Sequence, residues 1–157
     1  MYNGNFPTQI DLEHIAERYS LDLIVLFGSQ ASGQARAGSD VDVAVHLANG
    51  QRHRTIAGKR CLPWEWEGRL INDLSDALHL ADNLDLVILN RASPLLLYQA
   101  ARQGRPLYQK EATTFVNFRL YTLHILRDSQ IRYQQRWQWV KDHTARWRAE
   151  EVGNVSR

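Results

Sequence analysis

The fold of this chain follows from the segment LIVLFGS at residues 23–29 and from the DVD that comes after ten further residues, at 40–42. A continuous apolar run of this length predicts a strand that is buried on both faces, and the run stops at Gly28. Gly28 lets the backbone turn and approach a ligand closely, while the Ser29 hydroxyl and the exposed N–H groups of the turn can hold phosphate oxygens. The segment therefore predicts a strand that leads into a phosphate-binding turn.

Two acidic residues stand at the head of a second predicted strand, which covers residues 41–47. Because side chains alternate along a strand, the carboxylates of Asp40 and Asp42 are expected on one face. Their like charges repel, so the pair is costly for structure alone, but oxygen ligands at this spacing suit a hard cation such as Mg²⁺. The pair predicts a metal site for nucleotidyl transfer.

A third acid, Asp85, lies near the start of the apolar strand LDLVIL at residues 84–89. If this strand lies beside the first two acids, three carboxylates meet at one sheet edge and could hold two divalent ions roughly 3.5–4 Å apart. Such a pair supports in-line attack on an α-phosphate, with Asp85 as the base. Each feature alone is common, since Asp-x-Asp also occurs in turns and Ser29 could equally cap a helix. Their combination indicates nucleotidyl transfer.

The pattern G-S-x10-D-x-D, followed by a strand-borne Asp, resembles the nucleotidyltransferase superfamily related to DNA polymerase β. The small size and the segments DLVILN (85–90), SPLLLY (93–98) and GRPLY (104–108) resemble the minimal MNT-type proteins that are encoded beside HEPN toxins. The resemblance covers roughly residues 10–110.

This resemblance implies an antitoxin that uses ATP and Mg²⁺ to attach AMP to a tyrosine of a partner HEPN ribonuclease, which is thereby silenced. Carried over by position, Gly28 and Ser29 would hold the triphosphate of ATP. Asp40 and Asp42 would ligate metal, and Asp85 would be the third ligand and the base. Relatives often carry basic residues directly after the Gly-Ser turn, whereas the first cation after the turn is here Arg36.

The bulk composition bounds the class of protein. A chain of 157 residues is expected to form one domain with a substantial core. The single Cys61 excludes an internal disulfide and is expected to be a packing residue. The six His residues show no zinc-ligand spacing. Because no leader or long apolar span is evident, we expect a soluble cytoplasmic protein that does not contact the membrane.

Charge is unevenly distributed along the chain. Residues 1–100 hold 8 Lys and Arg against 12 Asp and Glu, whereas residues 101–157 hold 11 against 5. The C-terminal third is therefore a candidate docking surface for an acidic partner. Nucleic acid is not the expected partner, since cations spread along a mixed-charge helix more often form a solvated face.

Apolar periodicity and turn residues predict an α/β (α+β) fold, with a mixed sheet flanked by helices and a long C-terminal helical extension. Residues 1–110 form the nucleotidyltransferase core, and residues 111–157 form the extension within the same structural unit. The basic segment 51–60 is left unassigned. The expected helices cover residues 8–20 (with Thr8 as a cap), 29–33, 63–80 and 95–102, and the expected strands cover 21–27, 41–47, 84–89 and 106–108.

From about Thr114 the chain lacks Gly and Pro until Gly153, which predicts one long helix or two shorter ones. Its second half has a narrow stripe of aromatic and apolar residues and is expected to contact a partner or a second copy. Its first half is expected to pack on the core through its apolar positions. These are Phe115, Phe118, Leu120, Tyr121, Leu123, His124, Ile125 and Leu126 in the first half, and Ile131, Trp137, Val140 and Trp147 in the second.

Arg119 and His124 form an R-x4-H arrangement that resembles the HEPN nuclease signature. A HEPN domain is a helical bundle, and the roughly 45 residues left after the core are too few to form one. His124 is therefore expected to be a satisfied core or interface histidine.

Three functions remain open. The first is AMP transfer to a HEPN toxin. The second is nucleotidylation of a small molecule such as an aminoglycoside, which would normally need an added helical domain for the acceptor. The third is a non-catalytic antitoxin that binds its partner through the basic, Trp-bearing C-terminal helix.

Overall fold

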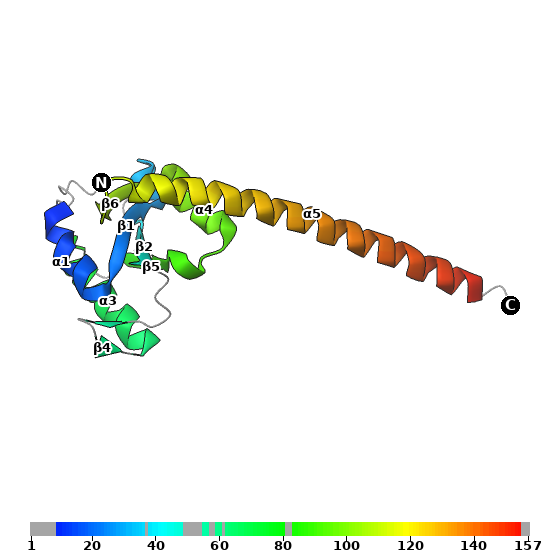
Figure 1. Cartoon of the computed structure of the whole chain (residues 1–157), viewed down its shortest axis with the longest axis horizontal. Coiled ribbons are helices and arrows are strands. Elements are labelled where there is room, and N and C mark those ends of the chain that lie inside the picture. The colour runs from blue at the N-terminus through cyan, green and yellow to red at the C-terminus, as the bar shows by residue number, and fades with distance from the viewer. Residues whose placement is uncertain are drawn as a thin grey trace.

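The computed structural model describes residues 9–36, 38–48, 55–56, 59–60, 62–80 and 83–154 (Figure 1). Its centre is a four-stranded sheet with the order β5-β2-β1-β6. Strands β2 and β5 are parallel, and the other neighbours are antiparallel, so the predicted mixed sheet is confirmed. The strands are β1 (Leu21–Phe27), β2 (Val41–Leu47), β5 (Leu84–Ile88) and β6 (Arg105–Gln109).

The two central strands are the most apolar ones, because both of their faces are covered. Six of the seven residues of β1 are buried, and only Asp22 is partly exposed. Strand β6 contains Pro106, which has no N–H to donate and is therefore tolerated at the edge of a sheet. Strand β5 forms the other edge and leaves Asp85 exposed.

Helices α1 (Gln9–Tyr19) and α3 (Pro63–Ala77) cover one face of the sheet (Figure 1). The Tyr19 and Trp66 rings, both fully buried, meet edge to face with their centroids 5.7 Å apart. The Tyr19 hydroxyl donates a 2.7 Å hydrogen bond to Asp73, so the polar end of this core aromatic is satisfied. This contact joins the N-terminal helix to α3.

Helix α3 ends at Ala77, three residues before the expected end. The N–H of His79 donates to the Asp76 carbonyl and the N–H of Leu80 to the Ser75 carbonyl, while His79 takes φ = 53°. These two bonds form a Schellman motif, which closes a helix in the left-handed conformation. The apolar pattern continues to Leu80 because Leu80 still packs on the core after the helix has ended.

Helices α4 (Pro94–Gln103) and α5 (Thr114–Asn154) cover the opposite face. The Ser93 hydroxyl caps α4 by accepting the Leu96 N–H at 3.3 Å, with Pro94 in the first turn. Behind α4, a Cβ at Gly104 would overlap the Ala100 carbonyl and the Val25 side chain. The core on this face consists of Leu23, Val25, Phe27, Ala44, Leu89, Leu97, Ala100, Ala101 and Phe118.

Helix α5 is a single helix of 41 residues that extends well beyond the sheet (Figure 1). The expectation that its first half packs on the core is confirmed for one stripe of the helix and wrong for the other expected positions. Phe118 and Thr122 are buried, and Phe115, Ile125 and Leu126 are partly buried. The other residues that were expected to contact the core, including His124, are exposed. A straight helix presents only one stripe to a sheet, so apolar residues that surround it cannot all reach the core.

The short helix α2 covers Gly28–Ala31 rather than residues 29–33. Within the segment left unassigned, β3 (Thr55–Ile56) and β4 (Lys59–Arg60) form a small hairpin. Thr8, Cys61 and the side chains of Trp137, Val140 and Trp147 lie outside the described part. Among the described residues, no helix combines the length and apolar character that a membrane crossing requires.

Candidate active site

Gly28 ends β1 and begins α2, and two features of its surroundings require glycine. Its φ is +70°, in the left-handed region that side chains rarely adopt. A Cβ at this position would also overlap the Asp42 carboxylate. Asp42 is the register partner of Phe27, so the antiparallel pairing of β1 and β2 brings the turn against this acid.

The parallel pairing of β2 and β5 brings two of the predicted acids together. Asp42 and Asp85 are direct register partners, and the Val41 N–H donates a 2.8 Å hydrogen bond to the Asn83 carbonyl at the beginning of the pair. Asp40 immediately precedes β2. Asp40 and Asp85 are exposed, whereas Asp42 is half-buried between them and the turn.

The electrostatics of the site affect the carboxylate of Asp42. Burial raises the pKa of Asp42 above the usual range, and the negative charges of Asp85 and Asp40 raise it further. A backbone hydrogen bond opposes this shift. Across the described residues, no three His, Cys, Asp or Glu side chains converge at distances suited to one metal ion. The three carboxylates therefore lie near one another but do not converge on one metal position, as expected for side chains of like charge.

The turn after β1 is closed by its own polar groups. The Ser32 hydroxyl donates to the Gly28 and Ser29 carbonyls at 3.1 and 3.3 Å, and the Gln34 N–H donates to the Ser29 carbonyl at 3.0 Å. Phe27 occupies the N-cap position of α2, so Ser29 lies inside the helix and does not cap it. The Ser29 hydroxyl remains half-exposed at the end of the strand.

A tight turn immediately before Asp40 sets the direction of the chain into β2. The Arg36 N–H donates to the Ser39 hydroxyl and the Ser39 N–H to the Arg36 carbonyl, both at 3.0 Å. The Gln30 side-chain amide reaches the Ser39 carbonyl at 3.5 Å, which links α2 to this turn. The Gly-Ser turn and the acids are therefore connected by hydrogen bonds as well as by the sheet.

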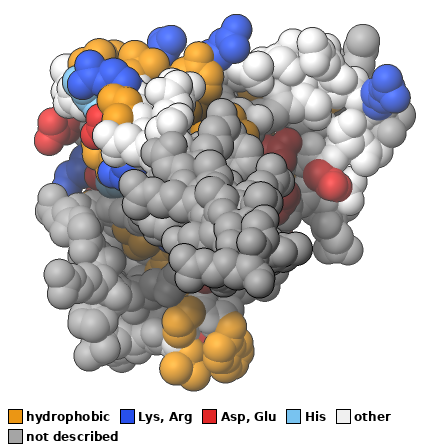
Figure 2. Space-filling view, turned by 90° about the vertical axis from the view of Figure 1, so that its right-hand side faces the viewer, with side chains coloured by type: hydrophobic (Ala, Val, Ile, Leu, Met, Phe, Trp, Pro, Cys, Tyr) orange, Lys and Arg blue, Asp and Glu red, His pale blue; other side chains and the backbone are white. Residues whose placement is uncertain are grey.

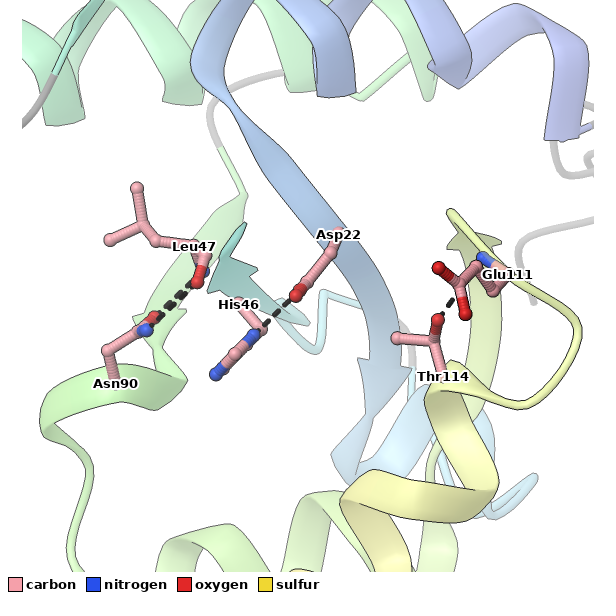
Figure 3. A network of polar contacts seen from close by, with 6 residues as sticks. All are labelled: Asp22, His46, Leu47, Asn90, Glu111 and Thr114. Carbon is pink, nitrogen blue, oxygen red and sulfur yellow. Dashed lines mark hydrogen bonds and ion pairs between the residues drawn. The ribbon is translucent and has the colours of Figure 1, made fainter. Parts of the chain in front are cut away.

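Sequence reasoning missed a polar group at the other end of the same strands (Figure 3). His46 Nδ1 lies 2.6 Å from Asp22 Oδ1, across β1 and β2. Nearby, the Asn90 side chain accepts the Leu47 N–H at 2.8 Å and donates to the Leu47 carbonyl at 3.1 Å. Polar residues inside otherwise apolar strands were the signal available for Asp22 and His46. They do not belong to the group of three acids.

Comparisons with known proteins agree with this geometry. A family model described as polymerase beta, nucleotidyltransferase, matches residues 11–113. A protein adenylyltransferase MntA from Aphanizomenon flos-aquae (strain 2012/KM1/D3) is 29% identical over 117 residues, which are 71% of this chain and 76% of that protein.

Solved structures with the same fold come from toxin-antitoxin complexes. A chain of a toxin-antitoxin crystallised with AMP-PNP matches with a TM-score of 0.61 and 26% identity, covering 84% of this chain and 97% of that one. A chain from a tri-AMPylated Shewanella oneidensis HEPN toxin in complex with MNT antitoxin matches with a TM-score of 0.53 and 26% identity, with the same coverage. The present chain belongs to the polymerase β nucleotidyltransferase family.

Proposed function

We propose that this protein is a cytoplasmic antitoxin that transfers AMP from ATP to a tyrosine of a cognate HEPN ribonuclease toxin. The observation that supports it most is the meeting of the Gly28 turn, Asp42 and its register partner Asp85 at one end of the sheet. The similar proteins add the acceptor class, since they include a protein adenylyltransferase and antitoxins in complex with HEPN toxin.

The Gly28-Ser29 turn is the proposed site for the triphosphate of ATP. Gly28 has no side chain to keep a phosphate away from the backbone, and the carbonyls of the turn are already hydrogen-bonded internally. The half-exposed Ser29 hydroxyl and the N–H groups at the start of the turn are then available to phosphate oxygens.

Asp40, Asp42 and Asp85 are the proposed ligands of Mg²⁺, with two ions expected. The donor set consists of carboxylate oxygens, which hard cations prefer. Burial, and after it the negative charges of Asp85 and Asp40, raise the pKa of Asp42, and a bound cation would offset these costs of ionisation. When bound, Mg²⁺ would neutralise triphosphate charge and lower the pKa of the attacking hydroxyl.

In the proposed reaction, the hydroxyl oxygen of the acceptor tyrosine attacks the α-phosphorus of ATP. The bond between the α-phosphorus and the bridging oxygen breaks, and pyrophosphate leaves. The phenolic proton passes to the Asp85 carboxylate. Asp85 suits this role because it is exposed on an edge strand, where an acceptor can approach from solvent.

The direct test is intact-mass measurement of the cognate HEPN protein after incubation with this chain, ATP and Mg²⁺. We expect mass increases of whole adenylate units, located on tyrosine by peptide mapping. The increases should vanish in Asp40→Ala/Asp42→Ala and when EDTA replaces Mg²⁺.

A second candidate is an antitoxin that acts by binding alone, which the exposed apolar side of α5 favours. Ribonuclease assays distinguish the two functions. Neutralisation that survives in Asp40→Ala/Asp42→Ala without any mass increase would replace the catalytic proposal with the binding one.

A further inference from the structure

The first turns of α5 expose apolar side chains on the side that faces away from the core. Val116, Leu120 and Leu123 are 55%, 55% and 53% exposed, whereas Phe118 and Thr122 on the other side are buried. The three exposed residues are spaced by four and then three positions, which is the spacing of a helix-helix contact. We call these three residues the α5 seam.

The seam does not continue along the helix. The next positions at the same spacing are Arg127 and Gln130, both exposed and polar. The apolar contact area is therefore limited to about two to three turns at the beginning of α5, where the helix is supported by the sheet and by α4. On the face shown in Figure 2, hydrophobic side chains reach the surface beside Lys and Arg side chains.

A cavity of about 540 Å³ opens between the start of α5 and the sheet. Asn117 and Tyr121, which lie on the helix between the seam and the core-facing stripe, form one wall. The apolar side chains of Leu23 and Phe118 line it together with polar groups. Those groups include the Asp22–His46 pair and Glu111, whose N–H donates to the Thr114 hydroxyl (Figure 3). The seam and the cavity thus form one continuous surface with an apolar ridge and a half-polar depression.

Basic side chains border this surface. Arg119 and Arg127 flank the seam, and Lys110 lies at the cavity. In the described part of the chain none of these three forms an ion pair, and the Arg119 guanidinium lies 6.0 Å from the Phe115 ring centroid. Two acids line the cavity, Asp22 and Glu111, and Asp22 is already paired with His46.

The charges favour an occupant other than a second copy of this chain. Residues 113–127 contain Arg119 and Arg127 but no Asp or Glu. A second copy would therefore bring four arginines and no carboxylate to the contact, which is unfavourable. A partner with carboxylates beside its apolar stripe matches the surface instead.

We propose that the α5 seam and the adjoining cavity dock an amphipathic helix of the acceptor protein. Its apolar stripe would cover the seam, its carboxylates would face Arg119 and Arg127, and one aromatic side chain with a polar end would enter the cavity. This inference rests on the proposed function, because it takes the acceptor of AMP as the partner.

The position of the surface is compatible with AMP transfer to a docked protein. By strand alternation, Asp42, Ala44 and His46 share the sheet face that α4 and α5 cover, and Ala44 belongs to that core. His46 at the cavity and Asp42 at the active site are four residues apart on β2, or about 13 Å. A protein held on α5 therefore remains within reach of the acids.

The test uses the whole chain of residues 1–157 and the cognate HEPN protein proposed as its acceptor. Leu120→Glu/Leu123→Glu should weaken its binding, measured by calorimetry, by at least about tenfold, and slow AMP transfer at low toxin concentration. Both leucines are exposed, so the thermal unfolding curve should be retained. The matched control is Leu62→Glu/Trp64→Glu, which changes two exposed apolar residues before and in α3 and should bind normally.

The outcomes separate the two proposals. Equal toxin binding by Leu120→Glu/Leu123→Glu and the wild type overturns the docking surface and leaves the catalytic proposal intact. Binding that is lost in this variant while the wild type transfers no AMP overturns the catalytic proposal alone. No binding by the wild type overturns both. A wild-type dimer that the variant abolishes, detected by light scattering, would instead identify a second copy as the occupant.

Discussion

At the scale of single residues, Gly28 connects the fold to the chemistry. Its position at the end of a buried strand brings the backbone so close to Asp42 that a side chain does not fit. The same closeness places the Gly28-Ser29 turn, the proposed triphosphate site, beside a carboxylate whose pKa is raised by burial and by its neighbours Asp85 and Asp40. The site thus combines a backbone conformation that requires glycine with a half-buried carboxylate beside two like charges.

Gly28→Ala should lower the free energy of unfolding by about 1–3 kcal/mol, because it adds backbone strain and a clash with Asp42. The rate of AMP transfer should fall by more than the loss of folded protein explains, because the added Cβ forces the turn or Asp42 to move. Gly33→Ala is the matched control. Gly33 has nearly the same φ, +72°, but a Cβ there would meet no described atom within 4 Å. Urea unfolding and transfer assays would contradict the argument if both variants behaved alike.

Asp42→Asn should stabilise the metal-free protein at neutral pH. The folded state raises the pKa of Asp42, so it binds the proton more tightly than the unfolded state, and stability is lost as pH rises and the carboxyl ionises. The amide side chain cannot ionise, so Asp42→Asn avoids this loss. The free energy of unfolding should rise by less than about 1 kcal/mol, because the site is partly solvated. The gain should disappear at acidic pH. Thermal unfolding in EDTA measures it, with the exposed Asp128→Asn as a control that should not change.

At the scale of elements, α4 holds the second face of the sheet through its close approach to β1. The helix is capped by Ser93 and ends against Gly104, where the chain turns into β6. A Cβ on residue 104 would overlap both the Ala100 carbonyl and the Val25 side chain. Helix α4 can therefore lie this close to β1 only because residue 104 has no side chain.

Gly104→Ala should lower the free energy of unfolding by about 1–3 kcal/mol, because a backbone carbonyl cannot move aside cheaply. Gly68→Ala, in the interior of α3, should have the opposite effect. Its Cβ would meet nothing described within 4 Å, and replacing a helical Gly by Ala stabilises by about 0.5–1 kcal/mol. Chemical denaturation of the two variants would refute this account if the shifts had the same sign.

At the scale of the whole molecule, charge and shape divide the protein into two parts. The sheet end presents three acids, whereas residues 101–157 hold 11 Lys and Arg against 5 Asp and Glu. Helix α5 extends from the core and adds a long surface to it (Figure 1). This arrangement suits an enzyme that holds a protein partner on one surface and modifies it at another.

Association with an acidic partner should therefore depend on salt. Between about 50 and 500 mM NaCl the association rate of the HEPN protein should fall several-fold, because screening shortens the range of attraction. In Arg119→Gln/Arg127→Gln the dependence should be weaker. Stopped-flow or biosensor measurements with equal salt slopes for both proteins would show that these arginines do not guide the partner.

The elements that could be predicted are those whose signal is local. Strands β1 and β2 have the bounds that the apolar runs and the Gly28 break predict, and α4 and β6 lie within a residue or two of their expected positions. Among the candidate site residues, the structure brings the turn, Asp42 and Asp85 together and places Asp40 next to them. Their roles in holding ATP and Mg²⁺ remain proposals.

What could not be predicted depends on partners that are distant in the chain. The apolar residues of α5 indicate a helix but not which of them face the sheet, because that choice depends on how α5 lies against α4 and β1. The contact of Gly28 with Asp42, the register of Asp42 with Asp85 and the Asp22–His46 pair likewise arise from strand pairing. Local sequence sets backbone preference and the type of chemistry, whereas register and packing direction set which side chains meet and which remain exposed for a partner.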